Sequence, residues 1–312
     1  MATKNNHQED KEIEEEKSYD LSNFGDVISM FTDELDDKQI AHHVAEYLTK
    51  IITDAGMDKY RVVFLFDDYN SISSFHSDKV YQAISDLNKS SDILLVLQSG
   101  GGKIEPAYLI SKSCKRLCKK KFLVSVPRQA KSAATLISLG ANEIHMGLLS
   151  ELGPIDPQFG GFPASGLANA MEKIAEMSCR FPASSDLFAK YLTDNLDIRD
   201  LGYFERINES AVQYAERLLK GKKFPEGWNE QSLANHLTNH YKDHGFVIDS
   251  DEASSLLGKT MIKESTAEYQ LGNQIYDFLD FLGFAYRAIR KKSIRYVGGI
   301  ENGLNTNDLP EK

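Results

Sequence analysis

Ser132 is the residue whose type and setting first indicate chemistry in this chain. It lies in a stretch of small residues, KSAA at 131–134, between a predicted strand and a predicted helix. A serine hydroxyl is a weak nucleophile until a neighbouring base takes its proton. At a helix start the oxygen is exposed, and the Ala133 amide points toward a developing oxyanion. A serine at this position can also serve only as an N-cap, so the residue type alone leaves both roles open.

A triple-glycine turn, Gly100–Gly102, is the second feature with chemical potential. It follows a predicted buried strand, and glycine lets the backbone approach a bound carbonyl with no Cβ in the way. Turns at the carboxyl ends of parallel strands meet in one crevice, where such folds place their chemistry. We therefore expect the glycine turn to lie beside Ser132, where it is the natural place for an oxyanion hole.

The elements that must position this crevice alternate between strand and helix. Short apolar runs predict buried strands, and amphipathic segments predict the helices between them. The predicted strands are 60–66, 93–97, 122–126 and 143–146, and the predicted helices are 37–55, 77–87 and 105–118. This alternation predicts an α/β fold with right-handed crossovers and a mainly parallel sheet.

Beyond residue 150 the sequence predicts a loop rich in glycine and proline and then a mostly helical half. The loop is 151–165, and the helices are 166–177, about 184–194, 203–220, one from 229 that ends at Gly245 as a C-cap, 249–257 and 268–291. Asp156 in the loop is expected to bond backbone amides and shape the turn. Residues 298–312 are predicted to be frayed, and the acidic residues 1–20 to be disordered.

Composition is typical of a globular protein and excludes several functions. With 312 residues, 41% of them hydrophobic, the chain can bury a real core. Its net charge of −10 argues against a nucleic-acid partner or an anionic membrane surface. No run of 18 apolar residues occurs, so no membrane span is expected, and the first residues lack an apolar signal core. Cys114, Cys118 and Cys179 lack metal-ligand spacing, so we expect a reduced, cytoplasmic protein.

The sequence predicts neither a metal site nor a cofactor. The histidine pairs His42 with His43 and His236 with His240 have no third ligand at a defined spacing. The turn SGGG is not G-x-G-x-x-G, and the sequence contains no Walker loop. Nucleotide and dinucleotide chemistry is therefore not expected.

The order of these motifs resembles the serine dehydrogenase proteinase family, a signal-peptide-peptidase-A-like branch of the Clp-protease/crotonase superfamily. The resemblance rests on SGGG before a helix, on VPRQAKSAATLISLGANEIHM and on LGPIDPQ, and it is strong over roughly 60–260. Gly100 stands where the family usually has proline, and Ala134 where it usually has glycine. The resemblance implies a Clp/crotonase-like β-α superhelix and a serine peptidase that cleaves polypeptide through an acyl-enzyme.

The same resemblance implies roles for the glycine turn. The Gly102 amide would join the Ala133 amide in the oxyanion hole, and the substrate would bind as an added strand beside Gly100 and Gly101. Ser132 would be the nucleophile.

Assembly is also implied, because relatives of this kind form rings. We expect a homo-oligomer, for which the apolar stripe of the C-terminal helix offers a surface. The predicted organisation is an acidic tail at 1–20, a Clp/crotonase-like peptidase domain at 21–265, an assembly helix at 266–297 and a frayed tail at 298–312.

Two residues compete for the role of base. Clp proteases have a histidine 25 residues after the serine, but that position is Pro157 here. Relatives of the stomatin-operon protease type have a lysine 41 residues after it, which corresponds to Lys173 and must be desolvated to be neutral. His244 lies in a segment similar to a late family stretch and could be oriented by Asp243 or Asp249, and an imidazole can act as a base without special burial. Spacing leaves the choice open.

An alternative function is a catalytically inactive scaffold or adaptor of the same fold. It is motivated by Ala134 in place of glycine and by the missing Clp-type histidine.

Overall fold

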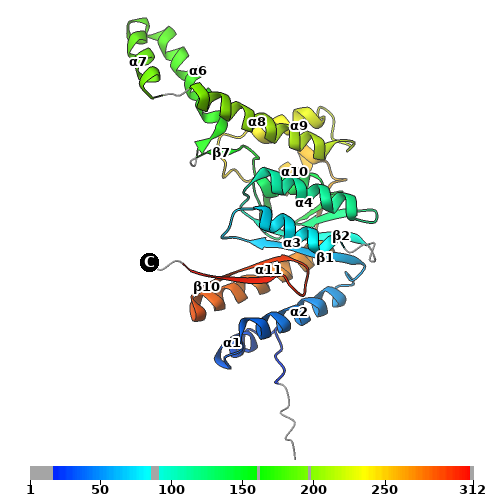
Figure 1. Ribbon diagram of the computed structural model, residues 1–312. Helices are drawn as coiled ribbons and strands as arrows, with labels where there is room; N and C mark the ends of the chain where they lie inside the picture. Colours follow the sequence, from blue (N-terminus) through cyan, green and yellow to red (C-terminus); the bar gives the residue numbers. More distant parts are fainter. Residues whose placement is uncertain (1–16, 86–90, 160–161, 196–197, 310–312) are drawn as a thin grey trace, which may run out of the picture.

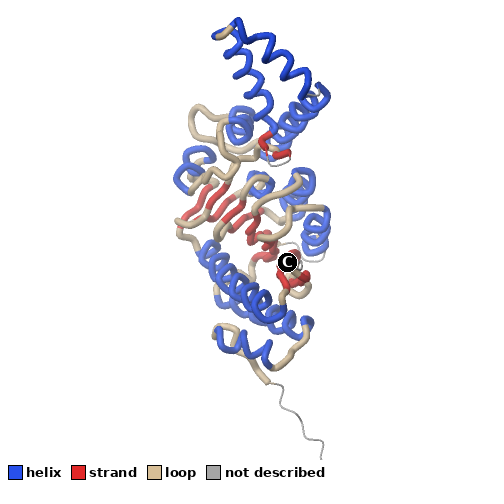
Figure 2. The backbone as a smooth tube through the Cα atoms, turned by 90° about the vertical axis from the view of Figure 1, so that its left-hand side faces the viewer, coloured by secondary structure: helices blue, strands red, loops and turns tan. Residues whose placement is uncertain are grey.

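A twisted β-sheet runs through the middle of the molecule, with helices on both faces (Figure 1 and Figure 2). The computed structural model describes residues 17–85, 91–159, 162–195 and 198–309, and within these ranges nine strands form the sheet. The path of the sheet is β11-β10-β1-β2-β3-β5-β9, and β4 pairs with β2 and β6 beside it.

The strands of the sheet are β1 Tyr60–Asp67, β2 Asp92–Ser99, β3 Phe122–Ser125, β4 Gln129–Ala130, β5 Glu143–Met146, β6 Glu151–Leu152, β9 Ile262–Glu264, β10 Lys292–Gly298 and β11 Leu304–Asp308. A separate two-stranded ribbon consists of β7 Gln158–Phe159 and β8 Phe162–Pro163. Within the nine-stranded sheet the pairs among β1, β2, β3, β4, β5, β6 and β9 are parallel, and β10 and β11 add antiparallel pairs at one edge. The predicted α/β fold of the Clp/crotonase type is confirmed.

The helices are α1 Phe24–Thr32, α2 Asp37–Asp54, α3 Ser74–Ile84, α4 Ile104–Leu117, α5 Ala133–Leu139, α6 Ala164–Arg180, α7 Ser185–Asn195, α8 Ile198–Leu219, α9 Glu230–Asn239, α10 Ser250–Leu257 and α11 Ala267–Ala285. A short 3-10 turn, Pro182–Ser184, precedes α7, and a π-helical turn, Tyr286–Arg290, extends α11. Helices α6 and α7 project away from the sheet, and α8 returns the chain to it (Figure 1).

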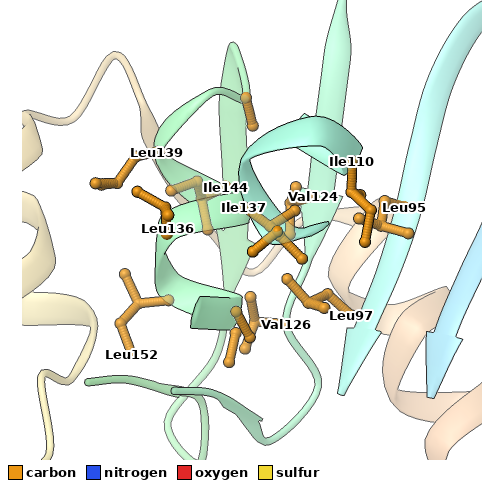
Figure 3. Close-up of a cluster of buried hydrophobic side chains, with 14 of the residues drawn as sticks. Leu95, Leu97, Ile110, Val124, Val126, Leu136, Ile137, Leu139, Ile144 and Leu152 are labelled. Carbon is orange, nitrogen blue, oxygen red and sulfur yellow. The ribbon is translucent and has the colours of Figure 1, made fainter. Parts of the chain in front are cut away.

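The sheet separates two hydrophobic clusters because its central strands are buried on both faces. In β1, Val63 and Leu65 point into one cluster, while Val62 and Phe64 point into the other. The first cluster contains α3, α4 and α5, and Figure 3 shows part of it around Ile137. The second contains α1, α2 and α11. Burial on both faces explains why these strands are continuous apolar runs in the sequence.

The C-terminal segment departs from the prediction in two ways. The apolar stripe of α11, which we expected to serve assembly, is buried in the second cluster of the same chain. This stripe consists of Ile275, Phe278, Leu279, Leu282 and Ala285. Strand β11 lies within the tail predicted to be frayed, and it pairs with β10 over five residues. The pattern LNTND lacks apolar alternation because β11 is a polar edge strand, so periodicity could not reveal it.

The helix expected to end at Gly245 also ends earlier. Helix α9 stops at Asn239, and Gly245 lacks the positive φ of a C-cap glycine. The segment 240–247 is therefore a loop, and this loop carries His244. The predicted acidic tail up to residue 16 lies outside the described residues. Among the helices that the structure describes, none has the length and apolar character to cross a membrane.

A half-buried lysine after α8 makes the stability of this fold depend on pH. The ammonium of Lys222 donates a hydrogen bond to the Ala141 carbonyl and lies 3.7 Å from the Met261 sulfur. Burial, together with the smaller effect of the positive charge of Lys115, lowers the pKa of Lys222 to about 7. Between that value and the higher pKa of an unfolded lysine, the unfolded state binds more protons, so stability rises with pH.

We expect Lys222→Met to flatten this pH dependence. From pH 6 to pH 9 the wild type should gain on the order of 2 kcal/mol of unfolding free energy from Lys222, and the methionine variant should lack that gain. Urea unfolding at both pH values measures the difference, with the exposed neighbour Lys220→Met as control. Equal pH dependence in wild type and Lys222→Met would contradict the assignment.

Candidate active site

Ser132 occupies a strained turn between β4 and α5. Its φ of 53° and ψ of −119° fall in a region that non-glycine residues rarely adopt. Two backbone hydrogen bonds hold the turn. The Lys131 amide donates to the Ser99 carbonyl at 3.0 Å, and the Ala134 amide donates to the Lys131 carbonyl at 2.8 Å. The side chain makes no capping hydrogen bond, which removes the simple N-cap role. A strained serine on a strand-to-helix turn is typical of an exposed nucleophile.

The glycine turn lies directly against this serine. A Cβ on Gly101 would be 2.7 Å from the Ser132 Cβ and 2.8 Å from the Lys131 carbonyl oxygen, and the φ of Gly101 is +108°. Gly102, with φ +150°, is equally constrained, because a Cβ there would be 2.2 Å from the Ile72 nitrogen. Only glycine fits these two positions, so the close approach of the two turns depends on them.

A cleft of about 960 Å³ opens over these two turns. Its wall is made by loop 68–71, the glycine turn with the start of α4, the loop 155–158, the serine turn, His244, and one face of α8. The α8 residues that line it are Tyr203, Arg206, Ile207 and Ser210. The sequence predicted a helix here but gave no sign that it borders the cleft, since that follows only from how α8 packs.

His244 is held in the cleft by Asp156, 88 residues away in sequence. Its Nδ1 lies 2.7 Å from Asp156 Oδ1, and Gln158 donates to Asp156 Oδ2 at 2.7 Å. The Asp156 side chain is 5% exposed and that of His244 is 31% exposed. With Nδ1 donating to the carboxylate, Nε2 is the nitrogen that can accept a proton. Ser132, His244 and Asp156 are thus the residue types that can serve as a nucleophile, a base and an orienting acid.

The Ser132 hydroxyl has no hydrogen-bond partner within the ranges that the structure describes. It is partly exposed and lines the cleft together with His244. Catalytic hydrogen bonds are often formed only when substrate is bound, so an unpaired hydroxyl is compatible with a nucleophile.

The residue that orients His244 differs from the two that we expected. The Asp243 carboxylate accepts the Gly245 amide at 2.9 Å, and Asp249 caps α10 by accepting the Glu252 amide at 2.9 Å. Asp156, expected only to shape its loop, bonds the imidazole instead. A rigid loop between two prolines was the signal for a fixed carboxylate, but its distant partner could not be read from the sequence.

The other predicted base, Lys173, lies elsewhere. It is on α6, its side chain is 70% exposed, and its ammonium forms a 2.9 Å ion pair with Glu176. It is not among the residues that line the cleft. A lysine base must be desolvated to be neutral at physiological pH, and this position does not provide that burial.

Two backbone amides beside Ser132 are available to an oxyanion. For the amides of Gly102 and Ala133 no acceptor is found among the described residues, whereas the Gly101 amide donates to Ser99 Oγ at 3.2 Å. Both belong to the two turns that meet at Gly101. They match the pair expected to form the oxyanion hole.

A buried network holds the glycine turn from behind. The Ile72 amide donates to the Gly101 carbonyl at 2.8 Å, and the Lys103 amide donates to the Ile72 carbonyl at 2.9 Å. The loop that carries Ile72 is fixed by Asp67, whose Oδ2 lies 3.1 Å from His76 Nε2. Burial alone would raise the Asp67 pKa, but hydrogen bonds from His76 and neighbouring amides outweigh it and lower the pKa. Asp67 is therefore an anion that anchors this loop.

Comparison with known proteins agrees with this geometry. Residues 39–180 match the family described as ClpP-like SDH-type serine proteinase. The predicted family resemblance is confirmed. The SDH-type match includes the glycine turn, Ser132, Asp156 and Lys173, and it ends before His244.

Two curated relatives come from Methanocaldococcus jannaschii. The uncharacterized protein MJ0137 is 34% identical over 105 residues, which are 34% of this chain and 36% of that protein. The uncharacterized protein MJ1495 is 32% identical over 108 residues, 35% of this chain and 37% of that protein. This chain therefore spans little more than a third of the length of either relative.

Two similar solved structures are of the 1510-N membrane-bound stomatin-specific protease. One is a serine-to-alanine mutant, with TM-score 0.42, 14% identity, and coverage of 72% of this chain and 84% of that chain. The other is a lysine-to-alanine mutant in complex with a substrate peptide, with TM-score 0.42, 13% identity, and coverage of 82% and 94%.

We expect Gly101→Ala to abolish the reactivity of Ser132 while Gly100→Ala retains it. An added methyl at 101 collides with the Ser132 Cβ and the Lys131 carbonyl, whereas a Cβ at 100 meets nothing within 4 Å. Labelling by a small fluorophosphonate measures the effect, and thermal melting confirms that both variants fold. Equal labelling rates in the two variants would show that the close approach of the turns is not needed.

Proposed function

We propose that this chain is a serine peptidase in which Ser132 is the nucleophile, His244 the base and Asp156 the residue that orients the base. The strained Ser132 and the Asp156-bound His244 in one cleft are the observation that carries this proposal. The match to a family of serine proteinases supports it independently.

The proposed reaction uses these groups in sequence. Ser132 Oγ attacks the scissile carbonyl as His244 Nε2 takes its proton, and the Gly102 and Ala133 amides hold the resulting oxyanion. Collapse breaks the C–N bond, and the imidazolium gives its proton to the leaving amine. Water, deprotonated by His244, then attacks the acyl ester and releases Ser132. Asp156 holds Nδ1–H throughout and stabilises the imidazolium.

The substrate in this proposal is an extended polypeptide. One side of the glycine turn is already taken, because Ile72 bonds the Gly101 carbonyl and the Lys103 amide. A substrate strand would therefore lie on the open side, where Gly100 has no neighbour within 4 Å of a built Cβ. Assembly into a homo-oligomer stays a prediction, and the buried stripe of α11 does not supply its surface.

We expect a fluorophosphonate to label the wild type at a single serine and to leave Ser132→Ala unlabelled. The activated hydroxyl reacts covalently, so mass spectrometry of the labelled peptide identifies the site. Absence of labelling in the wild type at every protein concentration would contradict the peptidase and favour the inactive scaffold that Ala134 suggested.

We expect His244→Gln to lower the labelling rate by about 10²–10⁴-fold, the usual contribution of a general base. Asp156→Asn should lower it in the same direction, since a neutral amide lacks the negative charge that stabilises the imidazolium. Lys173→Met is the matched comparison and should retain the wild-type rate, because its ammonium is exposed and paired with Glu176. The reverse pattern, a loss in Lys173→Met and none in His244→Gln, would assign the base to the lysine.

A further inference from the structure

Lys131, the residue before the nucleophile, connects the serine turn to the loop that carries the base. Its ammonium donates to the Gly245 carbonyl at 2.8 Å and lies 3.5 Å from the Phe246 carbonyl. It also forms an ion pair with Glu151 at 3.0 Å, and its side chain is only 14% exposed. One side chain therefore joins three segments that are far apart in sequence.

The stem of Lys131 is confined as well as its ammonium. A Cβ added to Gly153 would lie 3.1 Å from the Lys131 Cδ, so backbone packs directly on the methylenes. The backbone amide of Lys131 bonds the Ser99 carbonyl at 3.0 Å, at the end of β2. The backbone and the ammonium of Lys131 are thus both fixed. The length of its side chain therefore sets the distance between the serine turn and the loop 244–246.

The loop on the other side has little burial of its own. Phe246 and Val247 are 42% and 50% exposed, and helix α9 has already ended at Asn239. Its local hydrogen bonds, from the Gly245 and Phe246 amides to Asp243, shape the turn without placing it relative to Ser132. The bond to Asp156 fixes the His244 ring, and the end of the loop is fixed by the paired backbones of Leu152 and Ile248. Between these two points, the backbone of 245–246 is held by Lys131.

We propose that Lys131 is a positioning residue that sets the distance between Ser132 and His244 by holding the 244–246 backbone against the serine turn. This inference rests on the proposed function, because it assumes that His244 serves Ser132. Lys131 is not itself a base in this arrangement. Its ammonium is directed to two carbonyls and a carboxylate.

The test compares Lys131→Met with Lys131→Arg in the full chain. Methionine keeps the apolar stem and removes the donors, whereas arginine keeps the charge and the donors. We expect Lys131→Met to lower kcat, or the fluorophosphonate labelling rate, by about 10–100-fold with KM nearly unchanged, since a displacement of about 1 Å can cost about 10²-fold. Lys131→Arg should recover most of the rate. Lys121→Met, which removes an ion pair with Glu143 outside the cleft, should behave like the wild type.

A double-mutant cycle separates positioning from general stabilisation. If Lys131 acts through His244, Lys131→Met should have no further effect on the labelling rate in a His244→Ala background. The same fold-loss in both backgrounds, or full activity of Lys131→Met alone, would overturn the inference. If Lys131→Met fails to fold, Glu151→Gln replaces it in the cycle, because it removes the ion pair with Lys131. Glu151→Gln should lower the labelling rate by a smaller factor, and this loss should also vanish in the His244→Ala background.

Hydrogen exchange supplies a readout that does not need activity. Lys131→Met should accelerate amide exchange at residues 244–246 and leave the strands of the sheet unchanged. If the fluorophosphonate never labels the wild type, the proposed function is wrong. Hydrogen exchange alone then tests whether Lys131 anchors the loop. Unchanged exchange at 244–246 in Lys131→Met would reject the anchoring role in either case.

Discussion

The cleft depends on the close approach of two backbone turns, one after β2 and one after β4. A Cβ on Gly101 would overlap both the Ser132 Cβ and the Lys131 carbonyl, so a single methyl group would force the turns apart. The parallel registers of β1, β2 and β3 bring the strand ends to the same edge of the sheet, where the turns meet. Because the amides of Gly102 and Ala133 belong to these turns, the close approach of the turns also places the two proposed oxyanion donors beside the serine.

This approach is maintained by rigid structure on both sides. Behind the glycine turn, Ile72 is paired to its backbone and the loop is anchored by the buried Asp67–His76 contact. Behind Ser132, all seven residues of α5 are buried in the core shown in Figure 3. A conformation like that of Ser132 costs about 1–3 kcal/mol and persists only where its surroundings allow no alternative. The two hydrophobic clusters of the fold hold the surroundings of the turn in place. The packing of the sheet therefore keeps the Ser132 hydroxyl exposed.

Sequence patterns predicted the parts of this site that are local. Buried strands, the glycine turn and Ser132 follow from apolar runs and small residues over short spans, and the structure places them together. The contact between Asp156 and His244 spans 88 residues and depends on where α9 ends, which the sequence placed too late. The stripe of α11 showed that one helix face must be buried, but it could not show that the covering surface is the chain's own sheet. Hydrophobic periodicity predicts which face of a helix is buried, but it does not predict which surface covers that face.

The choice between two bases follows from what each needs from its surroundings. A lysine needs removal from water to lose its proton, and α6 leaves Lys173 exposed beside Glu176. A histidine needs only the correct ring orientation, which a carboxylate held by Gln158 provides to His244. The family match contains Ser132 and Asp156 but stops before His244. The proposed base, His244, therefore comes from a loop outside the matched region, and residues within that region hold it in place. Asp156 bonds the ring, Lys131 bonds the backbone, and Leu152 pairs with Ile248 at the end of the loop.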